Sequence, residues 1–182
     1  MFIHSDTLYV YGGWNTTTGF PYSIKFDFST NEWTSSNMQI ESLPVWNHCG
    51  LEVESGPSWK YFAFGGSSKV FDETKLRERA DCCNKITVCD LDTEEMSEVN
   101  LEDDKLLPPP REDATMVYYQ QTKNLLIFGG WNNEWYGEIY GICVSSIVGP
   151  SYSVKGLEPE MGRISGGQKV KLIGSKLTSG II

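Results

Sequence analysis

The sequence lacks any apolar run close to the roughly 20 residues that a membrane-spanning helix requires, so we expect no membrane segment. Positive charge is also scarce, because 15 Lys and Arg stand against 24 Asp and Glu, which gives a net charge of −9. That balance argues against binding to nucleic-acid phosphates. Residues 1–6 contain neither the basic nor the apolar region of a secretion signal, which favours a cytoplasmic location.

Cysteine and histidine are few, and their spacing is poor for a disulfide framework or a metal site. The five cysteines are an odd number, form no CxxC motif and include the vicinal pair Cys82-Cys83, so we expect reduced thiols. His4 and His48 lie 44 residues apart, and we expect His48 and its neighbour Cys49 to be packed rather than to bind a metal. We predict no catalytic residue, no metal site and no cofactor.

Acidic residues are unevenly distributed. Residues 1–150 carry 10 basic and 22 acidic residues, whereas residues 151–182 carry 5 and 2. Eight acids fall between positions 90 and 104, among them Glu102, Asp103 and Asp104. This stretch is either a solvated loop or a surface that attracts a protein partner with a basic surface.

Glycine and aromatic residues are abundant, with 18 Gly, 8 Phe, 6 Trp and 9 Tyr, a composition typical of many short strands joined by tight turns. A run of aromatic and aliphatic residues ends in a glycine pair three times, which indicates an internal repeat. The three pairs are Gly12-Gly13, Gly65-Gly66 and Gly129-Gly130.

A strand, a turn and another strand follow the first pair, with Asp27, Thr30 and Trp33 marking the turn. In the second unit Met96 takes the place of Trp33. Met96 lies 30 residues after Gly66, whereas Trp33 lies 20 residues after Gly13, so the second unit is predicted to contain an insertion of ten residues. The third unit lacks the closing Thr and Trp. In it, we place Cys143 at the position of Phe26.

With Pro109-Pro110-Arg111 opening the third unit, these motifs resemble kelch repeats, the four-stranded blades of a β-propeller. The resemblance implies an all-β fold, a partial propeller of about two and a half to three blades over residues 1–148. Its units cover about 1–43, 44–106 and 107–148. Blades pack at close range, where glycine is favoured at strand ends and aromatic residues fill the space between sheets, so we expect Trp33 in the core.

Residues 149–182 have a different pattern. The segments 154–162 and 166–177 resemble the opening of an IPT/TIG domain, an immunoglobulin-like β-sandwich. Such a sandwich needs about 100 residues, so this module is expected to be incomplete. A propeller needs four to eight blades, and this chain starts near the second strand of a blade, without a clear first strand before it. We therefore interpret the chain as a segment of a longer protein, or as one that a partner completes.

The loops that follow the glycine pairs and those that link successive blades should lie on one face, where binding residues concentrate. The insertion at 72–80 contains helix-favouring residues and Asp72 as a possible cap, so it is either a contact arm or a disordered loop. Large apolar and polar side chains in the loops are candidate partner contacts, although the aromatic ones fold back over the blades in an equally good interpretation. The candidates are Trp14, Asn15, Phe20, Trp131, Asn132, Trp135 and Tyr136, with Glu102, Asp103 and Asp104 from the acidic stretch.

The favoured function is a non-enzymatic protein-binding scaffold in a larger cytoskeletal complex, with a flagellar or axonemal setting suggested by proteins that join kelch and IPT domains. One alternative is a copper-radical oxidase similar to galactose oxidase, which needs histidine and tyrosine ligands. Another is a kelch substrate adaptor for ubiquitin ligation, which needs a BTB-type domain.

Overall fold

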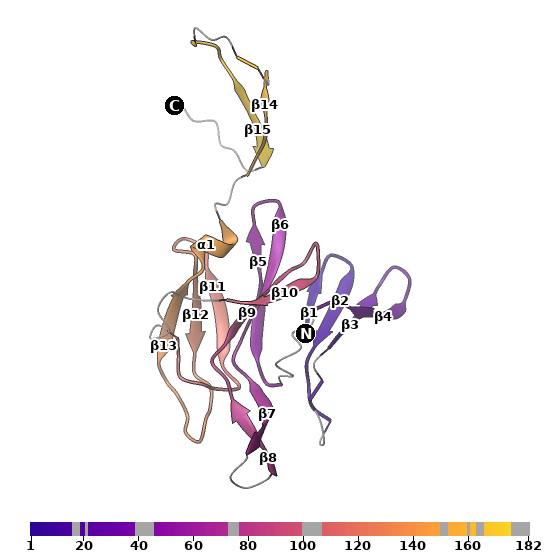
Figure 1. Cartoon of the computed structure of the whole chain (residues 1–182), viewed down its shortest axis with the longest axis vertical. Coiled ribbons are helices and arrows are strands. Elements are labelled where there is room, and N and C mark those ends of the chain that lie inside the picture. The colour runs from indigo at the N-terminus through magenta and orange to yellow at the C-terminus, as the bar shows by residue number, and fades with distance from the viewer. Residues whose placement is uncertain are drawn as a thin grey trace.

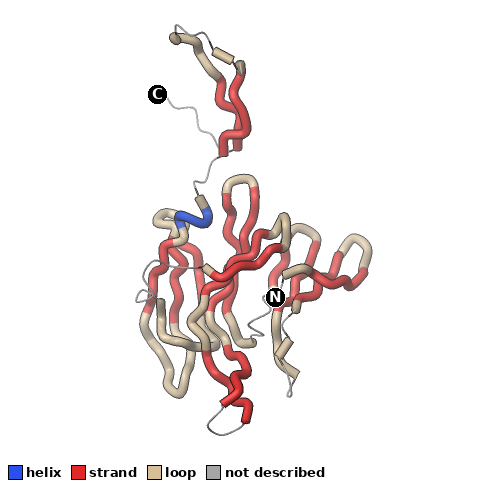
Figure 2. The backbone as a smooth tube through the Cα atoms, viewed as in Figure 1, coloured by secondary structure: helices blue, strands red, loops and turns tan. Residues whose placement is uncertain are grey.

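A computed structural model describes residues 1–15, 19–20, 22–38, 46–72, 77–99, 107–149, 153–159, 161–162 and 166–175. These residues form antiparallel β-sheets and one four-residue helix (Figures 1 and 2). The all-β prediction is therefore confirmed.

The first sheet is an up-and-down meander with the order β1-β2-β3-β4. Its strands are β1 (Phe2–His4), β2 (Thr7–Tyr11), β3 (Ser23–Asp27) and β4 (Glu32–Ser36). The Asp27 carboxylate accepts hydrogen bonds from the backbone N–H groups of Ser29 (2.7 Å) and Thr30 (3.1 Å), which fixes the predicted turn. The expectation that no strand precedes β2 was wrong, because Phe2–His4 pairs with the residues Thr7, Leu8 and Tyr9.

The second sheet has the order β10-β9-β6-β5 and repeats this plan. Its strands are β5 (Cys49–Ser55), β6 (Ser58–Phe64), β9 (Ile86–Asp90) and β10 (Glu95–Glu98). Asp90 takes the role of Asp27, since its carboxylate accepts the N–H groups of Asp92 and Thr93. The repeat pattern of the first unit thus predicts three of these four strands, namely β6, β9 and β10.

The insertion forms a separate β-hairpin of β7 (Ser67–Asp72) and β8 (Arg77–Cys82). The helical tendency predicted for residues 72–80 was therefore wrong at 72 and 77–80, which lie in strands, whereas residues 73–76 lie outside the described residues. Antiparallel pairing begins at the anchored base of the hairpin, where Trp46 and Ser67 exchange backbone hydrogen bonds of 3.0 and 2.8 Å, and this pairing overrides the weak helix propensity. The paired strands β7 and β8 project at the bottom of Figure 1.

The third sheet has the order β11-β12-β13 among the described residues. Its strands are β11 (Thr115–Tyr119), β12 (Asn124–Phe128) and β13 (Ile139–Cys143), followed by the helix α1 (Ser145–Val148). Leu125 pairs with Ile142, as Leu8 pairs with Phe26 in the first sheet. Ile142 rather than Cys143 therefore takes the place of Phe26, because the loop after the third glycine pair is one residue shorter.

A two-stranded antiparallel sheet follows, made of β14 (Ser153–Glu158) and β15 (Lys171–Ser175). The register shifts between Val154 and Gly156, which indicates a β-bulge. These strands fall in the two segments in which the sequence resembles an IPT/TIG domain. That assignment stays a prediction.

The core has two parts, one on each face of the second sheet. Successive residues of β6 point to opposite faces, so Tyr61 and Ala63 pack with Tyr9 of the first sheet. Phe62 and Phe64 pack with residues of the third sheet, including Ile127. The second sheet is therefore covered on both sides by sheets of the same kind.

Trp33 is 55% exposed, so its assignment to the core was wrong. Its ring lies 5.1 Å from that of Phe26, with which it pairs across β3 and β4. Both residues belong to the face of the first sheet that points away from the second sheet. Within the described part of the chain, no further sheet covers that face.

Candidate functional site

The loops after the glycine pairs and the segments that enter β5 and β11 meet at one edge of the sheets. We call this edge the glycine edge. Isolated backbone bridges connect the two kinds of loop, from Trp46 to Ser67 and from Glu112 to Trp131. The opposite edge carries the tight turns, such as the one between β5 and β6. The candidate residues of the loops after the first and third glycine pairs are thus brought to one side of the molecule.

At the second glycine pair the backbones of two sheets interlock. The N–H of Gly66 donates to the carbonyl of Arg111 (2.9 Å), and the N–H of Arg111 donates to the carbonyl of Cys83 (3.1 Å). Gly65 has φ +66°, and a Cβ there would lie 2.5 Å from the Arg111 carbonyl oxygen. Only glycine permits this conformation and this approach together.

Arg111 is fully buried and contacts the loop that follows the third glycine pair. Its guanidinium lies 4.0 Å from the centre of the Tyr136 ring and 5.2 Å from that of Tyr140, which are cation–π distances. Its Nη1 donates to the carbonyl of Gly129 at 2.9 Å. Tyr136, a candidate partner contact, is thus held against Arg111 inside the glycine edge.

The other candidate residues fall into two groups. The Asn132 side chain donates to the carbonyl of Pro110 (3.0 Å), and the backbone of Trp131 forms an isolated β-bridge with that of Glu112. Both residues therefore hold the loop in place. Trp135 is the most exposed of the six tryptophans, at 78%. Trp14 lies in the same kind of loop of the first sheet, with its ring 4.7 Å from that of Trp46.

Phe20 completes an aromatic group beside Trp14, with its ring 5.5 Å from that of Tyr22. Trp46 was missed as a member of this surface. Its position in the sequence was the available signal, because Trp46 stands three residues before β5, as Glu112 stands three residues before β11. Asn15 lies in the loop after Trp14. Glu102, Asp103 and Asp104 lie outside the described residues.

The exposed charged residues in the loop of Trp135 and in the neighbouring segment 112–114 are acidic, whereas Arg111 is buried. Glu134 and Glu138 are exposed in the same loop, and Asp113 is exposed in the neighbouring one. Glu112 accepts hydrogen bonds from Ser67 (2.6 Å) and Asn47 (3.3 Å), so its carboxylate also fixes the base of the hairpin. An exposed tryptophan in a loop that also carries exposed carboxylates is suited to a basic side chain.

The two histidines lie apart. His4 is 3.1 Å from a carboxylate oxygen of Glu52, and His48 packs edge-on against Tyr11 at 5.2 Å. Burial lowers the pKa of His48 to about 4, so this side chain is neutral at physiological pH. Across the described ranges, no three His, Cys, Asp or Glu side chains form a group suited to a metal ion. None of the helices described is long and apolar enough to span a membrane.

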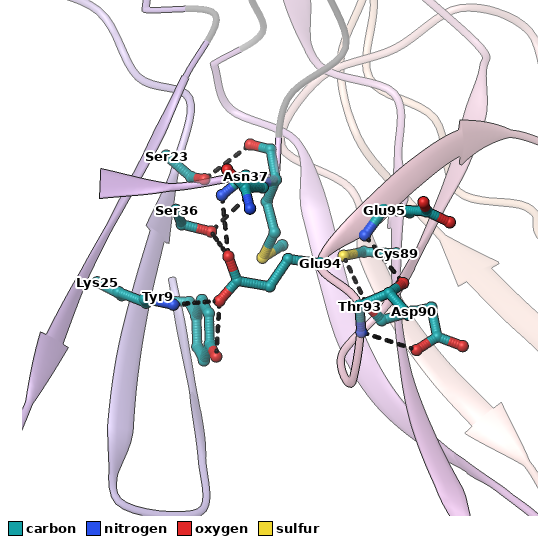
Figure 3. Close-up of polar contacts among 11 residues, drawn as sticks. Tyr9, Ser23, Lys25, Ser36, Asn37, Cys89, Asp90, Thr93, Glu94 and Glu95 are labelled. Carbon is teal, nitrogen blue, oxygen red and sulfur yellow. Dashed lines mark hydrogen bonds and ion pairs between the residues drawn. The ribbon is translucent and has the colours of Figure 1, made fainter. Parts of the chain in front are cut away.

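Glu94 forms a polar junction between the first two sheets, which the sequence did not predict (Figure 3). It comes from the turn between β9 and β10 and reaches the first sheet, where it is 9% exposed. Burial alone would raise the pKa of Glu94, but the hydrogen bonds outweigh this effect and hold the pKa below its ordinary value. The donors are Lys25 Nζ (2.5 Å), the N–H of Asn37 (2.9 Å), Ser36 Oγ (3.1 Å) and the Tyr9 hydroxyl (3.4 Å).

No protein-family model matches this chain. The chain is 30% identical over 177 residues to the dynein alpha chain of the flagellar outer arm of Chlamydomonas reinhardtii. That alignment covers 96% of this chain but only 4% of the dynein chain. A solved structure titled "Structure of YjhT" is similar with a TM-score of 0.58 and 13% identity, over 80% of this chain and 42% of that one. The structural likeness shows the fold alone.

Proposed function

We propose that this chain is a non-enzymatic protein-binding scaffold in a flagellar, axonemal dynein assembly. In this proposal, residues 1–148 are kelch blades of a β-propeller, and the residues from 149 onward begin an IPT/TIG-like module. The similarity to a flagellar outer-arm dynein chain covers nearly the whole length of the present chain, and it supports the flagellar setting. The three meandering sheets, each with a glycine pair after its second strand, support the kelch assignment.

The observation that carries the scaffold proposal is the contrast between a rigid support and exposed loops at the glycine edge. Buried Arg111 and the hydrogen bonds around the second glycine pair fix the loops. Trp135 nevertheless points its large side chain to solvent. Binding hot spots are enriched in tryptophan, tyrosine and arginine. The acids beside it favour a partner that presents Lys or Arg.

Binding of the 182-residue chain to flagellar axonemes tests this proposal. We expect saturable co-sedimentation with demembranated axonemes from which the outer arms have been extracted. Trp135→Ser should weaken binding at least tenfold, because loss of a hot-spot tryptophan costs about 2 kcal/mol or more.

Trp59→Ser is the matched control. Trp59 is a partly exposed tryptophan at the opposite edge, where β6 begins, so this variant should bind like the wild type. Equal losses in both variants, or no saturable binding by the wild type, would contradict a partner site on the glycine edge.

A further inference from the structure

The scaffold proposal gives no role to the insertion of the second unit, which forms the β7–β8 hairpin. At the base of this hairpin Ser67 of β7 and Cys82 of β8 are register partners. Ser67 is only 3% exposed, so the base is buried at the glycine edge although the strands project from it (Figure 1). The contacts of these two residues show what the base of the hairpin supports.

Glu112, three residues before β11, connects the base of the hairpin with residues 131–136, which we call the Trp135 loop. Its carboxylate accepts hydrogen bonds from the Ser67 hydroxyl (2.6 Å) and from the side-chain amide of Asn47 (3.3 Å). Its backbone N–H donates to the carbonyl of Trp131 (3.0 Å), and the N–H of Trp131 donates to the carbonyl of Glu112 (2.8 Å). One residue thus holds the hairpin with its side chain and the loop with its backbone.

The second strand of the hairpin reaches the same loop. The thiol of Cys82 lies 3.8 Å from the carbonyl oxygen of Trp131, which is a distance for a weak hydrogen bond from sulfur. The same sulfur lies 3.6 Å from the hydroxyl oxygen of Ser67. Both strands of the hairpin therefore support the Trp135 loop from the side.

Within the loop, the support of Trp131 extends to Trp135. The backbones of these two residues form an isolated antiparallel bridge, so the loop closes on itself. On the other side of Trp135, the ring of Tyr136 lies on the guanidinium of Arg111. The Trp135 side chain is itself mostly in solvent, so its orientation depends on the backbone that these neighbours hold.

The second unit shows that the carboxylate of Glu112 is the distinguishing feature. Trp46 stands at the equivalent position, and its backbone bridges Ser67 as that of Glu112 bridges Trp131. The indole of Trp46 packs on Trp14 and cannot accept a hydrogen bond in its ring plane. Glu112 therefore joins two neighbouring loops in a way that its counterpart cannot.

We propose that the hairpin holds the Trp135 loop in its partner-binding conformation, and that Glu112 is the positioning residue through which it acts. The hairpin needs no contact with the partner for this role. Without the bond between Ser67 and Glu112, the loop loses its lateral anchor and Trp135 samples several orientations. Binding must then order these orientations, which lowers the affinity. This inference rests on the scaffold proposal, in which Trp135 contacts the partner.

Fluorine NMR of the 182-residue chain labelled with 5-fluorotryptophan tests the support without any partner. Trp135→Ser identifies the Trp135 resonance by its loss. Glu112→Ala and Ser67→Ala should each shift and broaden this resonance, because both remove the same hydrogen bond. The resonance of Trp59, at the opposite edge, should stay unchanged and thereby show that the fold persists.

Two results of the fluorine experiment would overturn the proposal. A Trp135 resonance that stays unchanged in both variants would mean that Glu112 does not position the loop. A change with Glu112→Ala alone would mean that the hairpin gives the loop no support.

Binding to axonemes from which the outer arms have been extracted measures the consequence. Glu112→Ala and Ser67→Ala should each weaken binding about threefold to tenfold, the effect of ordering one freed side chain. The double variant should lose no more than either single variant, because both substitutions remove one link. Additive losses would show that the two residues act separately and would overturn the proposed link.

Glu112→Gln distinguishes positioning from direct contact with a basic partner. Its amide oxygen can accept the same two hydrogen bonds, so this variant should rescue the binding that Glu112→Ala loses. An equal loss with Gln and with Ala would overturn the positioning role, because it would mean that the charge of Glu112 meets the partner. Absence of binding by the wild type would contradict the scaffold proposal, whereas the fluorine NMR would still decide whether the hairpin supports the loop.

Discussion

Gly65→Ala is expected to lower the free energy of unfolding by about 4 kcal/mol. A left-handed conformation costs alanine about 1–2 kcal/mol. The new Cβ would also lie 2.5 Å from the Arg111 carbonyl oxygen, a backbone atom that cannot rotate away. Relief of this overlap requires the second and third sheets to separate, which costs about 1–3 kcal/mol more. Urea denaturation followed by circular dichroism measures the loss.

Gly129→Ala is the matched control for Gly65→Ala. Gly129 has φ +68°, almost the same as Gly65, but the nearest atom to its Cβ would be the Tyr136 carbonyl oxygen at 3.7 Å. Only the conformational cost of about 1–2 kcal/mol should remain. Equal effects of the two substitutions would show that the close approach between sheets at Gly65 does not exist.

Glu94→Gln is expected to destabilise the chain by about 3 kcal/mol, the second largest effect. The substitution keeps the size of the side chain but removes the charge that Lys25 pairs with, in a largely buried position. Glu95→Gln is the control, because Glu95 is the exposed next residue. It should change the free energy of unfolding by less than about 0.5 kcal/mol.

The effect of Glu94→Gln should depend on pH. Because the pKa of Glu94 is depressed in the folded chain, its carboxylate stabilises the fold above the ordinary value of 4.5. This contribution is lost as the pH falls through the lower folded-state pKa. The difference between wild type and variant should therefore be full at pH 7 and shrink under acid conditions. A difference that persists unchanged in acid would mean that the charge of Glu94 does not hold the junction.

Short-range signals predicted much of the fold. The strands before the glycine pairs and the turn at Asp27 depend on backbone conformations that particular residues impose, so they can be read from the sequence. The insertion was located correctly, but the sequence did not predict that it forms a hairpin. The base of this hairpin is held by backbone hydrogen bonds to Trp46, which lies about 20 residues before it in the sequence. Residues Phe2–His4 form a strand too short for a pattern to indicate.

The candidate site was predictable only in part. The alternation of strand directions was enough to place the loops on one edge. The sequence did not separate Trp135, which is exposed, from Tyr136, which contacts Arg111, because neighbouring residues point in opposite directions that the loop conformation decides. Glu94 was missed because its partners Lys25 and Ser36 are about 60–70 residues away. Trp33 was assigned to the core because it was assumed to have a neighbouring sheet on its side.

Native-state amide hydrogen exchange at Gly66 and Arg111 tests most directly the claim that the glycine pairs lock neighbouring sheets together. Both residues lie outside the strands, but their N–H groups donate to carbonyls of Arg111 and Cys83 across the junction. We predict that both amides exchange as slowly as those of β6, whereas Gly137, which bonds only to an exposed carboxylate, exchanges fast. Rapid exchange at Gly66 and Arg111, at the rate of Gly137, would contradict the account.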